Sequence, residues 1–340
     1  MHELELVPCA ERNRWEELLR QQESATVFHR QAWLHLVAAL SHSELHLYEV
    51  HQRGNVVGVC PLFFFRRGPV RIAACPPPQA AAPYLGPAVS RDLLPAALAA
   101  AASEARRQGA AYVEFRCQAH VPPSELSEPA FSFEPRSTFM LDLQSGPDYL
   151  WSNRLEPACR RAVRKAQNSG VVVEEVALRD IVDDYFAMAE QVFAKYHRPP
   201  PLSREDYEQM ARALEGADLA KVLVARHDGT ILAAGIFPYD QRTVYYLDGV
   251  SLSEGQALRP NNLLHWEVIR WACQAGLVQY DMVGAGIAGV ARFKRTFGPE
   301  EVPYTYCYRA LSPWVALARR AYALLAPAGR AIRYVLSKRS

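Results

Sequence analysis

The sequence repeats one order of secondary structure, and this repetition restricts the fold more than any other feature of the chain. Each half is expected to contain an amphipathic helix followed by a hairpin of two strands, because an apolar period near 3.6 gives way to an alternating pattern. These elements span 30–40, 44–50 and 56–65 in the first half, and 204–214, 221–227 and 230–237 in the second. Their common order predicts a duplicated α/β unit.

A further helix and strand follow in each half, over 91–115 and 260–282. Gly109 and Gly276 stand where each helix should stop, because glycine readily adopts the left-handed conformation that ends many helices. Glu114 and Asp281 each lie five residues beyond their glycine. The two copies therefore align through the strand that follows the helix.

The chain has 340 residues, which exceeds the size at which one hydrophobic core usually stops growing. We therefore expect a first domain over 1–146, a second over 147–310 and a C-terminal segment over 311–340. The seven cysteines are odd in number and scattered, with no Cys-x-x-Cys pair, so we expect no disulfide framework and no zinc site. His42, His46 and His51 lack a third ligand at metal-binding spacing.

We expect a cytoplasmic protein, because the acidic N-terminus carries no secretory signal and no apolar stretch reaches membrane-spanning length. The segment 311–340 is basic, lacks acidic residues and is divided by Pro327 into two amphipathic helices. Such a pair can attach peripherally to the inner face of a membrane or pack on the body of the protein. Both alternatives remain open.

Short motifs follow one another in a fixed order along residues 25–310. They are Val27-Phe28-His29 before Trp33, Tyr84-Leu85-Gly86-Pro87, the basic run from Arg160 to Gly170, Pro260-Asn261-Asn262-Leu263-Leu264 before Trp266, Tyr280-Asp281, and GVARFKRTFG at 289–298. In order and spacing they resemble the FemABX family of peptidoglycan aminoacyltransferases, and the last resembles that family's G-x-x-x-F-K-x-x-F-G signature. No helical-arm insertion occurs, so the short form of the family is the closer likeness.

This resemblance implies an α/β fold of tandem duplicated GNAT-like (acyl-CoA N-acyltransferase) domains with mixed central sheets. It implies an enzyme that forms an amide bond on a cell-envelope precursor or a related amine. Lys294 would stabilise the oxyanion formed when the amine attacks, and such donors contribute roughly 3–4 kcal/mol to lowering the barrier. Substrate contacts are expected from Phe293, Tyr84 and Trp33.

Asp281 lies at a strand end, where α/β proteins collect functional residues. It can orient the attacking amine or Lys294, or it can be an ordinary strand-end carboxylate. Arg160, Arg164 and Lys165 lie within one basic helix, which is either a solvated face or a grip for the phosphates of a nucleotide-linked acceptor or a tRNA.

The donor is expected to be an aminoacyl-tRNA. Acetyltransferases hold coenzyme A with a glycine-rich loop at a helix N-terminus, whereas Arg259 to Asn262 contains no glycine and includes Pro260, which lacks an N–H. Asn261 and Asn262 are candidate substrate contacts, and Asn261 is also a candidate helix cap. The alternatives are acyl transfer from coenzyme A or an acyl carrier protein to an amino sugar or metabolite, and a non-catalytic nucleic-acid-binding module. No metal or redox cofactor is required.

Overall fold

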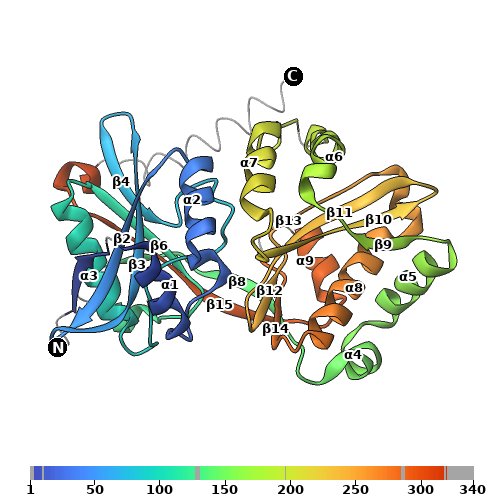
Figure 1. The fold of residues 1–340 in the computed structure, drawn as a ribbon, viewed down its shortest axis with the longest axis horizontal. Helices are drawn as coiled ribbons and strands as arrows, with labels where there is room; N and C mark the ends of the chain where they lie inside the picture. The colour runs from blue at the N-terminus through green and yellow to red at the C-terminus, as the bar shows by residue number, and fades with distance from the viewer. Residues whose placement is uncertain are drawn as a thin grey trace.

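The computed structural model describes residues 4–9, 11–126, 131–195, 197–284, 288–317 and 319. Most strands belong to one mixed sheet of order β1-β2-β3-β4-β6-β15-β8-β14-β12, to which β5 and β7 add short pairings. A smaller antiparallel sheet has the order β13-β11-β10-β9. Figure 1 shows two lobes: the smaller sheet lies in the second, and the larger sheet extends from the first lobe through β15 to β8, β14 and β12.

The strands of the first lobe are β1 (Leu4–Pro8), β2 (Glu44–Gln52), β3 (Asn55–Arg67), β4 (Val70–Cys75), β5 (Ala88–Val89), β6 (Tyr112–Cys117) and β7 (Ser132–Phe133). The remaining strands are β8 (Arg136–Asp142), β9 (Val172–Glu175), β10 (Ala220–His227), β11 (Thr230–Pro238), β12 (Thr243–Tyr245), β13 (Asp248–Ser251), β14 (Gln279–Asp281) and β15 (Glu300–Ala310). Strands β4 and β6 pair in parallel, as do β12 and β14. The parallel pairs therefore occupy the same place in both copies.

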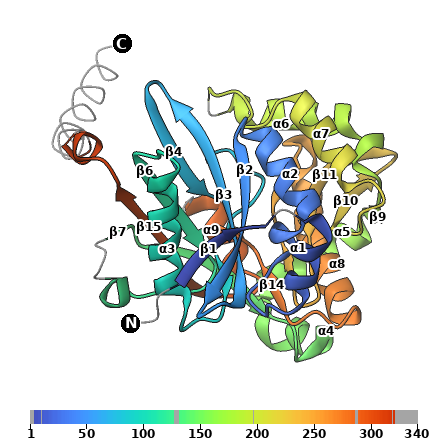
Figure 2. The same cartoon turned by 60° about the vertical axis from the view of Figure 1, so that its left-hand side comes forward.

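The helices are α1 (Arg12–Arg20), α2 (Gln31–Leu40), α3 (Leu94–Arg107), α4 (Gly146–Tyr149), α5 (Pro157–Asn168), α6 (Val182–Ala194), α7 (Arg204–Leu214), α8 (Pro260–Gln274) and α9 (Ala288–Arg295). In the first lobe, α3 covers one side of the sheet and α1 and α2 cover the other (Figure 2). Helices α6 and α7 pack on each other, and α5 packs on α8.

The structure confirms the repeated element order predicted from sequence. Helix α7 has the predicted bounds, and each predicted strand of the two hairpins is present within a few residues. Gly109 and Gly276 both adopt positive φ, at 81° and 77°, where the helices end. The duplicated α/β fold is therefore present, with one mixed sheet and a smaller sheet whose pairings are all antiparallel.

Strand β15 joins the two halves of the chain. Its C-terminal part pairs with β6 of the first lobe, whereas its N-terminal part pairs with β8, which in turn pairs with β14. Strands from 1–146 and from 147–310 thus share one sheet. No single cut in the sequence separates these strand pairings. The domain boundaries proposed from sequence therefore stay a prediction.

Between β12 and β13 the chain passes from the larger sheet to the smaller one, beside the end of β14. Tyr246 donates its N–H to the carbonyl oxygen of Asp281 (2.8 Å), whereas the next residue, Leu247, donates to Ile236 of β11 (3.1 Å). The chain thus leaves β14 at this point and joins the smaller sheet. Such a divergence exposes the end of β14 to the side chains packed above it.

The predicted C-terminal segment lies mainly outside the described residues. Residues 313–317 and 319 are helical, and Arg319 donates to the hydroxyl of Tyr112 in β6. None of the helices in the described ranges has the length and apolar character needed to cross a bilayer.

Candidate active site

Lys294 is a buried lysine on α9. Its side chain is 5% exposed, and its ammonium group donates to the carbonyl oxygens of Val283 and Gly284, the latter at 3.1 Å. The ammonium nitrogen also lies 5.5 Å from the centre of the Tyr246 ring. Burial lowers the pKa of Lys294 to about 8, although the nearby charge of Asp281 opposes this shift. One of its three N–H donors is left for another acceptor.

Asp281 is the last residue of β14 and is fully buried. Its Oδ1 accepts hydrogen bonds from the Thr138 hydroxyl (2.5 Å) and from the Val283 N–H (2.8 Å). Its Oδ2 has no hydrogen-bond partner among the described residues. Burial raises the pKa of Asp281 to about 6, while its hydrogen bonds and the charge of Lys294 act in the opposite direction.

Tyr84 and His265 bring further polar atoms to this site. Burial and the charge of Asp281 raise the pKa of Tyr84, whose hydroxyl makes no hydrogen bond within the described part of the chain. Burial and the charge of Lys294 lower the pKa of His265 to about 3, so this imidazole is neutral at physiological pH. Its Nδ1 lies 2.7 Å from the Tyr280 hydroxyl, whereas Nε2 has no partner among the described residues.

The aromatic wall of the site explains the unusual pKa values. Phe293 packs edge-on against His265, with 5.3 Å between ring centres, and Phe297 packs against both. These rings exclude water, which weakens the solvation of charged groups more than that of neutral ones. Buried polar atoms without partners are rare in folded proteins, and here they surround Lys294 and Asp281. Together they form a buried cluster of donors and acceptors that lack partners among the described residues.

This arrangement suits proton transfer combined with stabilisation of negative charge. At pH 7 the carboxyl group of Asp281 is mainly ionised and can accept a proton, because its pKa is about 6. Lys294 is mainly protonated at this pH and can stabilise an oxyanion. No group of three or more His, Cys, Asp or Glu side chains in the described ranges is placed to hold a metal ion.

The predicted basic cluster lies on α5, and its side chains differ in their contacts. Arg160 donates from one nitrogen to the carbonyl oxygens of Trp151 (3.0 Å), Ser152 (3.1 Å) and Leu155 (2.8 Å), which belong to or follow the short π-helix Leu150–Arg154. It thus stabilises the chain before α5.

The neighbouring basic side chains of α5 are more available. Arg161, Arg164 and Lys165 are exposed and make no ion pair within the described part of the chain. The guanidinium group of Arg164 lies 5.4 Å from the ring centre of Trp151. The start of α5 adjoins the end of α9, because Glu156 donates its N–H to the carbonyl oxygen of Thr296 (2.8 Å).

The structure corrects the expected helix cap at Asn261. Helix α8 begins at Pro260, and its N-cap is Arg259, which adopts a left-handed φ of 62° without a side-chain capping bond. Asn261 therefore lies within the first turn. Asn262 donates its side-chain amide to the sulfur of Cys159 on α5 (3.7 Å), so it connects two helices.

Trp33 lies in the core of the first lobe. It is 1% exposed, and its indole N–H donates to the carbonyl oxygen of Ala81 (2.7 Å). It therefore fixes the proline-rich loop that leads to Tyr84. The structure brings Tyr84 to Asp281, but it does not bring Trp33 or the basic face of α5 into this cluster.

Sequence reasoning missed three contributors to the site, namely Thr138, Tyr246 and His265. Thr138 belongs to a strand that precedes Asp281 by more than a hundred residues, so only the sheet pairing brings it near. Thr138 and Met140 share one face of β8, but the sequence did not show that Met140 lies opposite Asp281. His265 is the polar residue within a largely buried stretch of α8, which was the signal for its role.

Known proteins resemble this chain in sequence and in fold. The acetyltransferase (GNAT) domain family matches residues 155–295, which contain both Asp281 and Lys294. The UDP-N-acetylmuramoylpentapeptide-lysine N(6)-alanyltransferase of Weissella viridescens is 25% identical over 157 residues, or 45% of this chain and 45% of that protein. The match therefore spans less than half the length of this curated relative.

Solved structures share the fold over most of the chain. The crystal structure of FemX has a TM-score of 0.72 at 14% identity and covers 87% of this chain and 96% of that one. A tandem GNAT protein from the clavulanic acid biosynthesis pathway has a TM-score of 0.55 at 15% identity, covering 92% and 99%. This chain thus contains an acetyltransferase (GNAT) domain over residues 155–295, and its fold is similar to those of FemX and of a tandem GNAT protein.

Proposed function

We propose that this chain is an N-acyltransferase that forms an amide bond on an amine of a cell-envelope precursor, with an aminoacyl-tRNA as donor. The observation that carries the proposal is the buried pair of Lys294 and Asp281 at the end of β14. The pair lies within the segment that matches the GNAT domain family. The alanyltransferase from Weissella viridescens supports the acceptor class, because its name describes alanyl transfer to a lysine of such a precursor.

The reaction we propose forms one C–N bond and breaks one ester C–O bond. Asp281 accepts a proton from the acceptor amine as its nitrogen attacks the carbonyl carbon of the aminoacyl ester. The ammonium group of Lys294 donates a hydrogen bond to the resulting oxyanion. When the tetrahedral intermediate collapses, the proton held by Asp281 passes to the departing ribose oxygen. The carboxyl group is thus restored after each turnover.

The donor assignment is supported by the start of α8. Pro260 has no N–H, and the Asn262 N–H already donates to the Arg259 carbonyl oxygen (3.1 Å). Few backbone donors are therefore left for a pyrophosphate at this helix N-terminus. The exposed side chains of Arg161, Arg164 and Lys165 offer cationic groups for tRNA phosphates instead.

A transfer screen read by mass spectrometry tests the proposal. Purified protein is incubated with a pool of charged tRNA, or with acyl-coenzyme A donors, and with amine acceptors that include a lysine-containing envelope precursor. We expect a mass increase of one aminoacyl residue on the precursor, and no product with the Lys294→Met variant. Absence of any acyl transfer from all donors would contradict the proposed activity.

A further inference from the structure

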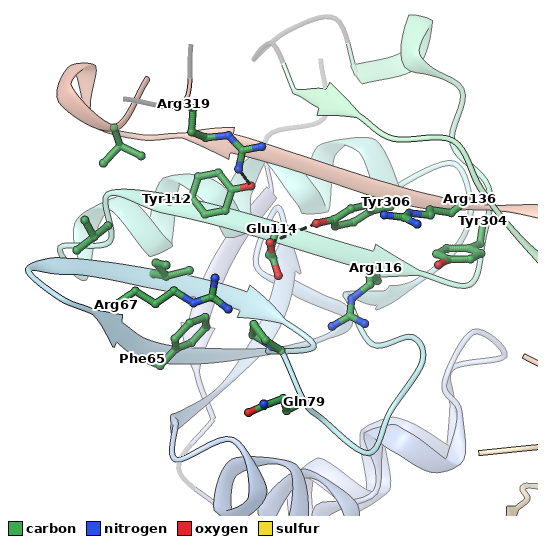
Figure 3. A pocket seen from close by; sticks show the side chains of 14 residues that line it. Phe65, Arg67, Gln79, Tyr112, Glu114, Arg116, Arg136, Tyr304, Tyr306 and Arg319 are labelled. Atoms are coloured by element: carbon green, nitrogen blue, oxygen red, sulfur yellow. Dashed lines mark hydrogen bonds between the residues drawn. The ribbon is translucent and has the colours of Figure 1, made fainter. Parts of the chain in front are cut away.

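A pocket of about 690 Å³ lies on the first-lobe sheet, at some distance along the sheet from Lys294. Its lining includes four arginines and three tyrosines, namely Arg67, Arg116, Arg136, Arg319, Tyr112, Tyr304 and Tyr306. Figure 3 shows these side chains around Glu114, with the loop that carries Gln79 on one side.

The pocket has an excess of positive charge. Glu114 is its one acidic lining residue, against four guanidinium groups. Arg136 pairs with Glu134 (2.7 Å), but Arg67 and Arg319 make no ion pair among the described residues. Arg116 likewise lacks an ion pair there and donates to the carbonyl oxygens of Pro76 (3.1 Å) and Pro77 (3.0 Å). The guanidinium groups thus outnumber the carboxyl group among them, and such an excess of positive charge favours binding of an anion.

Two of the lining arginines lie over aromatic rings. The guanidinium group of Arg136 lies 5.4 Å from the ring centre of Tyr306, and that of Arg319 lies 4.1 Å from the ring centre of Tyr308. Planar guanidinium groups held over rings present their N–H edges sideways, a geometry suited to the oxygens of phosphate. The rings also offer stacking surfaces for a planar part of the same ligand.

The pocket occupies the first-copy counterpart of the site in the second copy. Glu114 lies five residues after Gly109, as Asp281 lies five residues after Gly276. Both carboxyl groups are on strands that pair in parallel with an earlier strand of their copy. The register of β6, β15, β8 and β14 places Glu114 and Asp281 on one face of the continuous sheet.

We propose that this pocket is a second ligand site, which binds an organic phosphate in the first copy of the repeat. Arg67, Arg116 and Arg319 contact the phosphate oxygens, and the tyrosines contact a planar group of the ligand. The ring of Tyr304 packs on that of Tyr84 (4.9 Å between ring centres), and Tyr84 lies near Asp281. A ligand bound in the pocket therefore lies on the same sheet as Asp281, on the far side of these two tyrosines. The site is independent of the acyl-transfer chemistry, because none of these arginines belongs to the Lys294 cluster.

Calorimetric titration with pyrophosphate and with a nucleoside diphosphate tests the site without any acyl donor. We expect Arg67→Ala to weaken binding by about tenfold, because it removes one charge-assisted contact. Arg66→Ala is the matched control: Arg66 is the exposed neighbour on the opposite face of β3 and does not line the pocket. Glu114→Gln should tighten binding severalfold, since it removes the carboxyl group that opposes an anion.

Two further arms make the result decisive. Lys294→Met should bind the diphosphates as the unmodified protein does, so failure of acyl transfer and failure of this site are separate results. Vesicles of phosphatidylcholine with phosphatidic acid test whether the phosphate belongs to a lipid. If the protein binds these vesicles and Arg67→Ala weakens that binding, the result also supports the site. Absence of binding to all these probes, or equal weakening by Arg66→Ala and Arg67→Ala, would overturn the proposal.

Discussion

At the scale of single residues, Lys294 and Asp281 have opposite pKa shifts for one physical reason. Burial disfavours the charged form of each group, so it lowers the pKa of the lysine and raises that of the carboxyl group. Their mutual attraction reverses part of both shifts. The result is a window between about pH 6 and pH 8 in which the lysine is protonated and the carboxyl group is ionised. The proposed reaction needs both of these forms.

Replacing Lys294 by methionine should retain the fold and remove most of the activity. Methionine matches the length and apolar stem of lysine, whereas loss of an oxyanion donor typically lowers kcat by about a hundred- to a thousandfold. Single-turnover transfer measured beside circular dichroism separates the two effects. Arg292→Met, an exposed change two positions earlier on α9, serves as the control and should keep near-normal turnover. A Lys294→Met variant with near-normal turnover would exclude Lys294 from the mechanism.

The pH dependence of transfer should be bell-shaped. Activity is expected to fall below about pH 6, where Asp281 becomes protonated, and above about pH 8, where Lys294 loses its proton. Asp281→Asn should reduce activity and move the alkaline limb to lower pH, because the carboxylate raises the pKa of Lys294. Asp142→Asn, on the exposed end of β8, should leave both limbs in place. An alkaline limb that stays fixed in Asp281→Asn would show that the two groups are not coupled.

At the scale of elements, the position of α5 separates two roles within one basic cluster. Arg160 holds three backbone carbonyl groups, so it belongs to the local structure. Arg164 and Lys165 are exposed and make no ion pair among the described residues. The sequence predicted the cluster as a unit, because spacing shows which residues share a helix face but not which carbonyl groups lie within reach.

Charge reversal on α5 tests its role in binding phosphates. Arg164→Glu combined with Lys165→Glu should weaken tRNA binding and reduce the slope of log K against log salt by roughly one for each phosphate that the helix no longer neutralises. Fluorescence titration over a series of salt concentrations measures this slope. Gln167→Glu, an exposed change on the same helix, adds negative charge without removing a cation and should alter the slope little. An unchanged slope in the double variant would make α5 a solvated face.

Local patterns predicted the elements better than their pairing. The helix α7 and the glycine stops at Gly109 and Gly276 follow from periodicity and backbone preference, so the sequence was sufficient for them. The path of β15 between the lobes was not predicted, because its partners β6 and β8 lie more than 150 residues away in sequence. The Asp281 site depends on that path, since β15 aligns β8, and therefore Thr138, beside β14.

At the scale of the whole molecule, the two copies of the fold have diverged at equivalent places. The second copy buries Asp281 beside Lys294 under aromatic side chains. The first copy has Glu114 in an open pocket lined by arginines, and burial raises the pKa of this carboxyl group as well. One continuous sheet carries both sites. The duplication thus provides one place suited to proton transfer and another suited to anion binding.

The choice of donor tests the central claim most directly. Labelled aminoacyl-tRNA and a series of coenzyme A thioesters are each titrated into the protein, and transfer to an amine acceptor is followed in the same samples. We expect coenzyme A thioesters to bind with dissociation constants near or above ~1 mM, a binding free energy of only about −4 kcal/mol. We expect charged tRNA to bind more tightly and to support transfer that depends on Lys294. Micromolar binding of a coenzyme A thioester with turnover, and none from charged tRNA, would contradict the account.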